Sequence, residues 1–126
     1  MNEVHLPDGQ AVDFAAAIDA ALDALPDAFA DRLGSVAIVV EDEPTPDQLA
    51  SVGAPGLFGL YQGVPRTNWG ADGVPIPSKI TLFRGPLSRA NPDPDRLIRA
   101  IEATVHHEIA HHFGIDDARL HELQRR

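Results

Sequence analysis

The segment from Asp93 to Gly114 constrains the fold more than any other part of the sequence, because it predicts one long helix. Asp93 is followed by proline, which is a typical helix start: the aspartate can cap the first turn, and proline is tolerated there. Leu97, Ile101 and Val105 then recur at the spacing of a single helical face. Gly114 can adopt the left-handed conformation that ends many helices. We therefore expect a helix whose apolar face packs against the rest of the chain.

The last turns of this helix carry the sequence His107-Glu108-Ile109-Ala110-His111. Residues four apart lie above one another on a helix, so His107 and His111 can direct both imidazole rings at one metal ion. Glu108 lies beside this pair, where its carboxylate can accept a proton from a metal-activated water. The spacing predicts a metal site with Glu108 as the general base.

Two aspartates after the helix are candidates for the third metal ligand. A left-handed Gly114 would turn the chain back toward the histidines, which positions Asp117 as that ligand. Asp116 is its rival, although Asp116 could instead cap a last helix over residues 117–124. Substituting each aspartate by alanine would separate the two assignments.

The remaining histidines near this segment have weaker assignments. His106 falls on the polar side of the predicted helix, so we expect it at the surface. His112 and His121 have no spacing argument, and a role beside the metal ligands or near substrate is open for both.

The rest of the chain predicts short helices and strands separated by proline and glycine. The expected elements are a loose lead-in over 1–12, helices over 13–25, 27–33 and 46–52, strands over 35–41, 57–62 and 79–84, and a long irregular connection over 63–78. The apolar, β-branched strand 35–41 is expected to be buried, and Gly85-Pro86 is expected to end strand 79–84. The acidic run that follows strand 35–41 is expected to face solvent.

Length and composition exclude several classes of protein. The 126 residues suffice for one domain, 1–126, with a single core. The chain has no cysteine, which excludes disulfides and a thiol nucleophile and leaves histidine and carboxylate as metal ligands. The net charge of −9 argues against a nucleic-acid partner. No apolar run approaches the ~18 residues of a membrane helix, and the first ten residues lack the features of a signal peptide, so we expect a cytoplasmic protein without membrane contact.

Four segments of the sequence resemble, in order and spacing, the minimal zincin-like metallopeptidase family of small bacterial proteins. These segments are VAIVVEDEP, LFGLYQGVPRT, ITLFRGPL and TVHHEIAHHFGIDDARLHEL, and together they span most of the chain. The family pattern, His-Glu-x-x-His-x-x-Gly-x-x-Asp, maps onto His107, Glu108, His111, Gly114 and Asp117. The resemblance implies an α/β (α+β) fold in which a small mixed sheet of about three to four strands packs against the metal-bearing helix. It also implies a zinc-dependent peptidase acting on a peptide or protein substrate.

In such a peptidase, zinc lowers the pKa of a bound water toward ~7, and Glu108 takes the proton before a peptide carbonyl is attacked. Tyr61 and Arg84, at predicted strand ends, are candidates for contacting the substrate or the oxyanion that forms. Strand 79–84 could pair with an extended substrate if it lies at the edge of the sheet. Zinc is the default for two histidines and one carboxylate, although iron or manganese can use the same ligands.

Two other functions compete with the peptidase. The chain could be a zinc-binding interaction module that no longer turns over, or that stays latent. It could also be a metal-dependent ribonuclease on a related helix, an activity that its acidic composition opposes.

Overall fold

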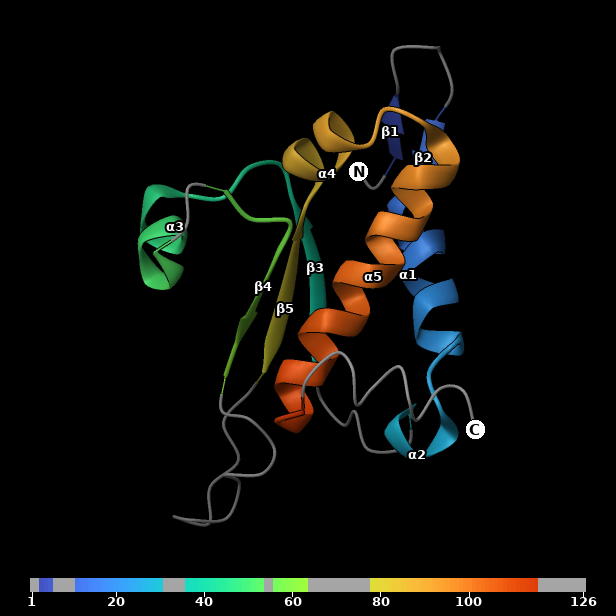
Figure 1. Cartoon of the computed structure of the whole chain (residues 1–126), viewed down its shortest axis with the longest axis vertical. Coiled ribbons are helices and arrows are strands. Elements are labelled where there is room, and N and C mark those ends of the chain that lie inside the picture. Colours follow the sequence, from blue (N-terminus) through green and yellow to red (C-terminus); the bar gives the residue numbers. More distant parts are fainter. Residues whose placement is uncertain (1–2, 6–10, 31–35, 54–55, 64–77, 116–126) are drawn as a thin grey trace.

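The fold is arranged around α5 (Pro94–Phe113), which crosses a small sheet beside a second helix, α1 (Phe14–Asp23) (Figure 1). The computed structural model describes residues 3–5, 11–30, 36–53, 56–63 and 78–115. Among these residues, no helix combines the length and the apolar character needed to cross a membrane.

The predicted limits of α5 are confirmed. The side chain of Asp93 caps the first turn by accepting a backbone N–H at 3.0 Å, and Gly114 ends the helix with φ of +69°. Leu97, Ile101 and Val105 are fully buried, so the helix presents the expected apolar face to the core.

A mixed three-stranded sheet packs against α5, as predicted. Its strands are β3 (Ala37–Glu41), β4 (Gly59–Gln62) and β5 (Lys79–Phe83), in the order β3-β5-β4. β5 pairs in parallel with β3 and antiparallel with β4. Ile80 and Leu82 of β5 are fully buried and belong to one core with α1 and α5.

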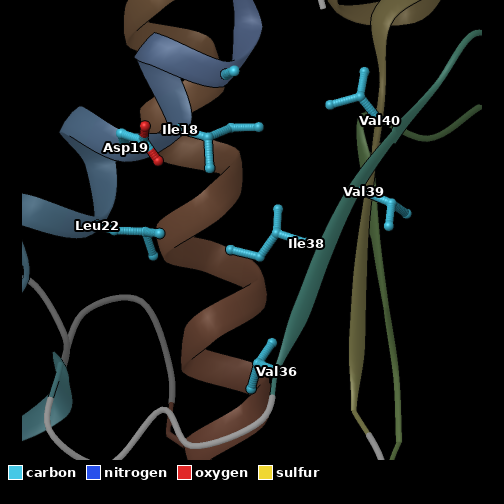
Figure 2. A pocket seen from close by; sticks show the side chains of 8 residues that line it. Ile18, Asp19, Leu22, Val36, Ile38, Val39 and Val40 are labelled. Carbon is cyan, nitrogen blue, oxygen red and sulfur yellow. The ribbon is translucent and has the colours of Figure 1, made fainter.

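One expectation about the strands was wrong, and one condition for substrate binding is not met. β5 is the central strand, so strand 79–84 is the interior strand that was the alternative to an edge strand pairing with a substrate; the outer strands are β3 and β4. β3 is not buried as expected, because each of its residues keeps partial or full exposure. A groove of about 400 Å³ lies between β3 and α1, where Ile38 and Val40 point toward the side of α1 that carries Ile18 and Leu22 (Figure 2).

The N-terminal residues are not the loose lead-in that we expected. β1 (Glu3–His5) and β2 (Ala11–Asp13) pair antiparallel, and α1 begins directly after β2. Asp13 caps α1 as predicted, accepting the Ala16 N–H at 3.2 Å. α1 ends before Pro26, and a single turn of helix, α2 (Asp27–Ala30), follows.

Two short helices lie on either side of β4 and β5 in the sequence. α3 (Pro46–Val52) is confirmed, and its start is a capping box in which Thr45 and Gln48 exchange side-chain and backbone hydrogen bonds. α4 (Arg84–Ala90) was not predicted, because its Gly-Pro pair was interpreted only as a strand end. The proline lies in the first turn of α4. Proline has no backbone N–H, and an N–H at this position would have no hydrogen-bond partner within the helix.

Candidate metal centre

The C-terminal half of α5 brings two histidines and one glutamate together. The ring centroids of His107 and His111 are 4.5 Å apart, and their side chains are 47% and 50% exposed. Glu108 projects from the next position on the helix, and its side chain is only 6% exposed. The cluster therefore has an open side formed by imidazoles and a buried side formed by a carboxylate.

The Glu108 carboxylate lies against both imidazoles. One oxygen is 3.2 Å from His111 Nδ1, and the other is 3.9 Å from His107 Nε2. Burial raises the pKa of Glu108 above the ordinary glutamate value, because desolvation penalises the charged form. The charges of His111 and His107, a hydrogen bond from His111 and one from the Tyr61 backbone act in the opposite direction but do not cancel this rise in pKa.

These residues fit a transition-metal ion. The candidate ligand atoms of His107, Glu108 and His111 lie within 4.8 Å of one another. Half-exposed imidazoles on adjacent turns of one helix can reach a common ion while leaving a position open for water or substrate. The set contains nitrogen and carboxylate donors, which suit zinc and also other divalent transition metals.

A glycine in β4 lets the sheet approach this cluster. A Cβ atom at Gly59 would lie 2.6 Å from the Thr104 methyl group and 3.4 Å from Glu108 Cγ. No real side chain tolerates the first of these distances without movement, so only glycine allows β4 to lie this close to α5. The sequence shows this glycine within a strand pattern, but it does not show what the glycine approaches.

The backbone of β4 faces the cluster as well. The Phe83 N–H donates to the Phe58 carbonyl at 2.9 Å, which places alternate β4 residues in hydrogen bonds with β5. In an antiparallel ladder the residues between them, Gly59 and Tyr61, turn their backbone groups away from β5. The hydrogen bond from the Tyr61 backbone to Glu108 agrees with this register.

The Tyr61 side chain has a different environment from the one expected of an oxyanion contact. Its hydroxyl is hydrogen-bonded to His112 Nδ1 at 3.1 Å and to Ser78 Oγ at 3.0 Å. His112 is fully buried and lies next to His111 in the sequence, so this network ties the metal-bearing helix to β4 and to the start of β5. Sequence spacing offered no signal for the role of His112.

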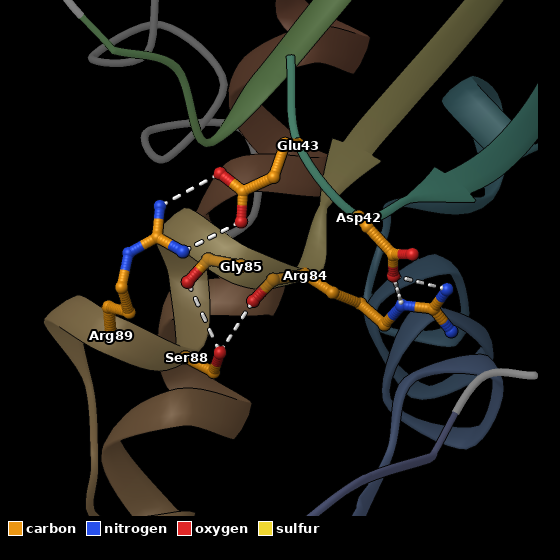
Figure 3. Close-up of polar contacts among 6 residues, drawn as sticks. All are labelled: Asp42, Glu43, Arg84, Gly85, Ser88 and Arg89. Atoms are coloured by element: carbon orange, nitrogen blue, oxygen red, sulfur yellow. Dashed lines mark hydrogen bonds and ion pairs between the residues drawn. The ribbon is translucent and has the colours of Figure 1, made fainter.

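Arg84 is not brought to the cluster. It begins α4, and its guanidinium contacts Asp42, with Nε 2.9 Å and Nη2 2.7 Å from one carboxylate oxygen (Figure 3). The neighbouring pair, Arg89 and Glu43, is bidentate, with N–O distances of 2.6 and 2.9 Å. The acidic run after β3 therefore faces solvent, as predicted, and is paired with arginines.

The expectation that His106 lies at the surface was wrong. Its side chain is 4% exposed, and Nε2 donates to the Ala21 carbonyl at 2.8 Å. Ala21 lies in the last turn of α1, where carbonyls lack partners within the helix, so His106 satisfies one of them. This contact fastens α1 to α5.

Several predicted features lie outside the described residues. They are Asp116, Asp117, His121, the last helix over 117–124 and most of the connection over 63–78. The choice between Asp116 and Asp117 as third ligand stays a prediction.

Comparison with known proteins agrees with this arrangement of residues. The family model described as zincin-like metallopeptidase matches residues 33–126, which include β3, β4, β5 and the whole of α5. A search of curated proteins gave no match.

Proposed function

Because the chain belongs to the zincin-like metallopeptidase family, we propose that it is a zinc-dependent peptidase with Glu108 as its general base. The observation that carries this proposal is a buried carboxylate held between two half-exposed histidines on one helix. The same arrangement suits hydrolysis, which needs a proton acceptor beside an open coordination position.

The ligands in this proposal are His107 and His111, with Asp117 assigned by the family pattern alone. A bound zinc ion would supply Lewis-acid chemistry, making water acidic and polarising the substrate carbonyl. Glu108 is assigned as the base and not as a ligand, because its carboxylate is buried and accepts a hydrogen bond from the Tyr61 backbone.

In the proposed reaction, a Glu108 carboxylate oxygen accepts a proton from the attacking water and later delivers it to the nitrogen of the leaving amine. Burial raises the pKa of Glu108, which makes the carboxylate a better proton acceptor than an exposed glutamate at neutral pH. The hydrogen bonds from His111 and from the Tyr61 backbone orient that carboxylate.

The substrate in this proposal lies along β4. β4 is an outer strand of the sheet, and the backbone groups of Gly59 point away from β5, whereas the backbone N–H of Tyr61 is already bonded to Glu108. An extended peptide can pair with such an edge, which would hold its backbone next to Glu108.

The test measures metal content and peptide cleavage on the same samples. We expect one zinc per chain in the wild type and loss of zinc in His111→Ala. With a broad peptide library, Glu108→Gln should keep zinc and lower the cleavage rate by about 10²–10⁴-fold, because the amide cannot accept the proton.

Other outcomes favour the alternatives. Zinc binding without any cleavage would support an interaction module or a latent enzyme. RNA cleavage by the metal-loaded protein would support a ribonuclease, and failure to bind metal after reloading would refute the site.

A further inference from the structure

The outer edge of β3 combines backbone hydrogen-bonding groups with a groove that lies beside them. β3 pairs with β5 on one side, and within the described ranges no strand pairs with its other side. The groove of about 400 Å³ between β3 and α1 is lined mostly by aliphatic side chains. The candidate metal centre lies beside β4, the opposite outer strand, so the β3 edge is a separate surface.

The hydrogen bonds of β3 show which of its backbone groups face this edge. The Ala37 N–H donates to the Ser78 carbonyl at 3.0 Å, so Ala37 uses its backbone groups toward β5. In a parallel ladder every second residue does so, which assigns Val39 to β5 as well. Ile38 and Val40 therefore direct their N–H and C=O groups away from β5.

The side chains of the same two residues point toward the groove. Figure 2 shows Ile38 and Val40 directed toward α1, whereas Val39 is directed to the opposite face of the sheet. Ile38 and Val40 pack against the core but keep partial exposure. β3 contains neither lysine nor proline, the residues that commonly prevent an edge strand from pairing with another strand. This edge therefore offers both hydrogen bonds and aliphatic surface to a further strand.

We propose that this edge binds β3 of a second copy of the chain, antiparallel and around a twofold axis at Val39. In this dimer, Ile38 of each copy lies opposite Val40 of the other. Both residues direct their backbone groups across the interface, which gives about four hydrogen bonds. The sheets join in the order β4-β5-β3-β3-β5-β4, and each candidate metal centre stays accessible beside an outer β4. The proposal does not depend on the peptidase function.

The aliphatic surface at this edge is complementary to a second copy of itself. Opposite side chains of an antiparallel pair lie on the same face of the sheet. Ile38 and Val40 of the second copy therefore lie beside the groove that Ile18 and Leu22 line. Covering these partly exposed aliphatic side chains is the main source of binding free energy. Asp19, the charged residue of the lining, is exposed, so its carboxylate stays hydrated.

Charge favours the antiparallel orientation. β3 ends at Glu41, and Asp42 and Glu43 follow it. Parallel pairing would place two acidic runs side by side, whereas antiparallel pairing puts them at opposite ends of the interface. Each Glu41 then lies opposite Ala37 of the other copy, on the face that carries Lys79, the β5 partner of Ala37. Lys79, which lies 4.0 Å from Glu41 of its own chain, thereby gains a second carboxylate nearby.

Cysteine cross-linking tests the register, because the chain has no cysteine of its own. The two Val39 residues form a pair without mutual hydrogen bonds, in which the Cα atoms are about 4.5 Å apart and within the range of a disulfide. Val39→Cys, treated with oxidised glutathione, should therefore form a covalent dimer. Ala37→Cys is the matched control on the same strand and face, because its two copies lie about 13 Å apart along the strands.

A mixture of two variants sharpens this test. Ala37→Cys and Glu41→Cys should each form little disulfide alone, but the two variants mixed together should cross-link, because these positions lie opposite one another. Val52→Cys, on the exposed surface of α3, measures random collision. Equal rates of cross-linking in Val39→Cys, Ala37→Cys and Val52→Cys would refute the interface.

Sedimentation velocity of the full chain tests association without an added bond. The wild type should show a reversible dimer with a dissociation constant on the order of 10 µM, as expected for a small interface. Val40→Lys should weaken association by about tenfold or more, because lysine on an edge strand opposes pairing. Val52→Lys adds the same charge on α3 and should associate like the wild type. Circular dichroism would verify that both variants fold.

The remaining outcomes also decide the proposal. A chain that stays monomeric up to about 1 mM would refute it, even if a peptide with the sequence of residues 36–41 binds to the edge. A dimer that persists in Val40→Lys and does not cross-link in Val39→Cys forms through another surface and would refute it as well. If Val40→Lys does not fold, the cysteine variants still decide. Zinc content should be equal in Val40→Lys and the wild type, so failure of the metal centre and failure of the dimer are distinguishable.

Discussion

The two outer strands of the sheet, β4 and β3, pair with the same central strand but differ in how closely helices approach them. At β4, the missing side chain of Gly59 lets Thr104 and Glu108 of α5 come into close contact. At β3, Ile38 faces Ile18 of α1 across an open groove (Figure 2). The candidate centre therefore lies at the edge where a glycine, which has no side chain, allows the strand and the helix to pack closely.

The two outer strands also differ in the polar contacts that attach them to the rest of the fold. Tyr61 of β4 is bonded through its hydroxyl to the buried His112 of α5. The chain beyond β3 is fastened by ion pairs at the surface, such as Glu43 with Arg89, whose side chains are 53% and 65% exposed (Figure 3). Buried polar contacts resist solvent screening better than exposed pairs, so we expect the β4 edge to be the more rigid one.

The largest effect is expected from Gly59→Ala. The new Cβ would lie 2.6 Å from the Thr104 methyl group, so β4 and α5 must separate. Overpacking of this kind costs about 1–3 kcal/mol, which urea denaturation would measure. Cleavage should fall as well, because Glu108 is in contact with the same strand.

Two further variants test the cause of that effect. Gly56→Ala should leave stability nearly unchanged, because its Cβ would meet nothing within 4 Å. Thr104→Ser removes the methyl group that the new Cβ would meet. The double variant Gly59→Ala/Thr104→Ser should therefore recover much of the stability lost in Gly59→Ala. Equal losses in Gly59→Ala and Gly56→Ala would show that β4 is not held by close contact.

A smaller effect is expected from Tyr61→Phe. Removing the hydroxyl breaks the bonds to His112 and Ser78 and should cost about 1 kcal/mol of stability. The backbone hydrogen bond from Tyr61 to Glu108 remains, so we expect little change in kcat. A loss of about 10²-fold or more in kcat, without loss of stability, would instead assign the hydroxyl to the oxyanion.

A comparison across one rung of the sheet tests the β3 edge. Ile38 and Ile80 are register partners, but Ile80 is fully buried and Ile38 is partly exposed beside the groove. Ile80→Val should cost about 0.5–1.5 kcal/mol and Ile38→Val less, a difference of about 0.5 kcal/mol in thermal or urea unfolding. Equal costs would mean that the groove is closed in solution.

The smallest effect concerns the ion pair at the end of β3. The hydrogen bond from Arg89 lowers the pKa of Glu43 below the ordinary value. A pKa that is lower in the folded state adds stability above the unfolded pKa, and this contribution is lost as pH falls through the folded pKa. Both groups are exposed, so NMR titration of the Glu43 carboxyl is the suitable measurement.

Arg89→Gln should return that pKa toward its ordinary value, and high salt should do the same in part. An unchanged pKa in Arg89→Gln would show that the pair does not form in solution. Overall stability should hardly respond to this substitution, in contrast to Gly59→Ala.

Sequence alone was sufficient for the features that depend on nearby residues. The ends of α5 follow from Asp93 and Gly114, and the pairing of His107 with His111 follows from the pitch of a helix. The small mixed sheet was also anticipated, through resemblance to a family whose model matches the chain. Caps and helical spacing are local, so they can be recognised before the rest of the fold is known.

Features that depend on which elements meet were decided only by the tertiary structure. His106 lies on the side of α5 expected to be polar, yet α1 packs there and offers the Ala21 carbonyl as a partner. Strand 79–84 became central and strand 35–41 became an outer strand, because strand order is not encoded in the alternation of side chains. The site itself divides in the same way: α5 determines the spacing of its histidines, whereas the burial of Glu108 and its hydrogen bond from Tyr61 exist only because β4 packs against that helix.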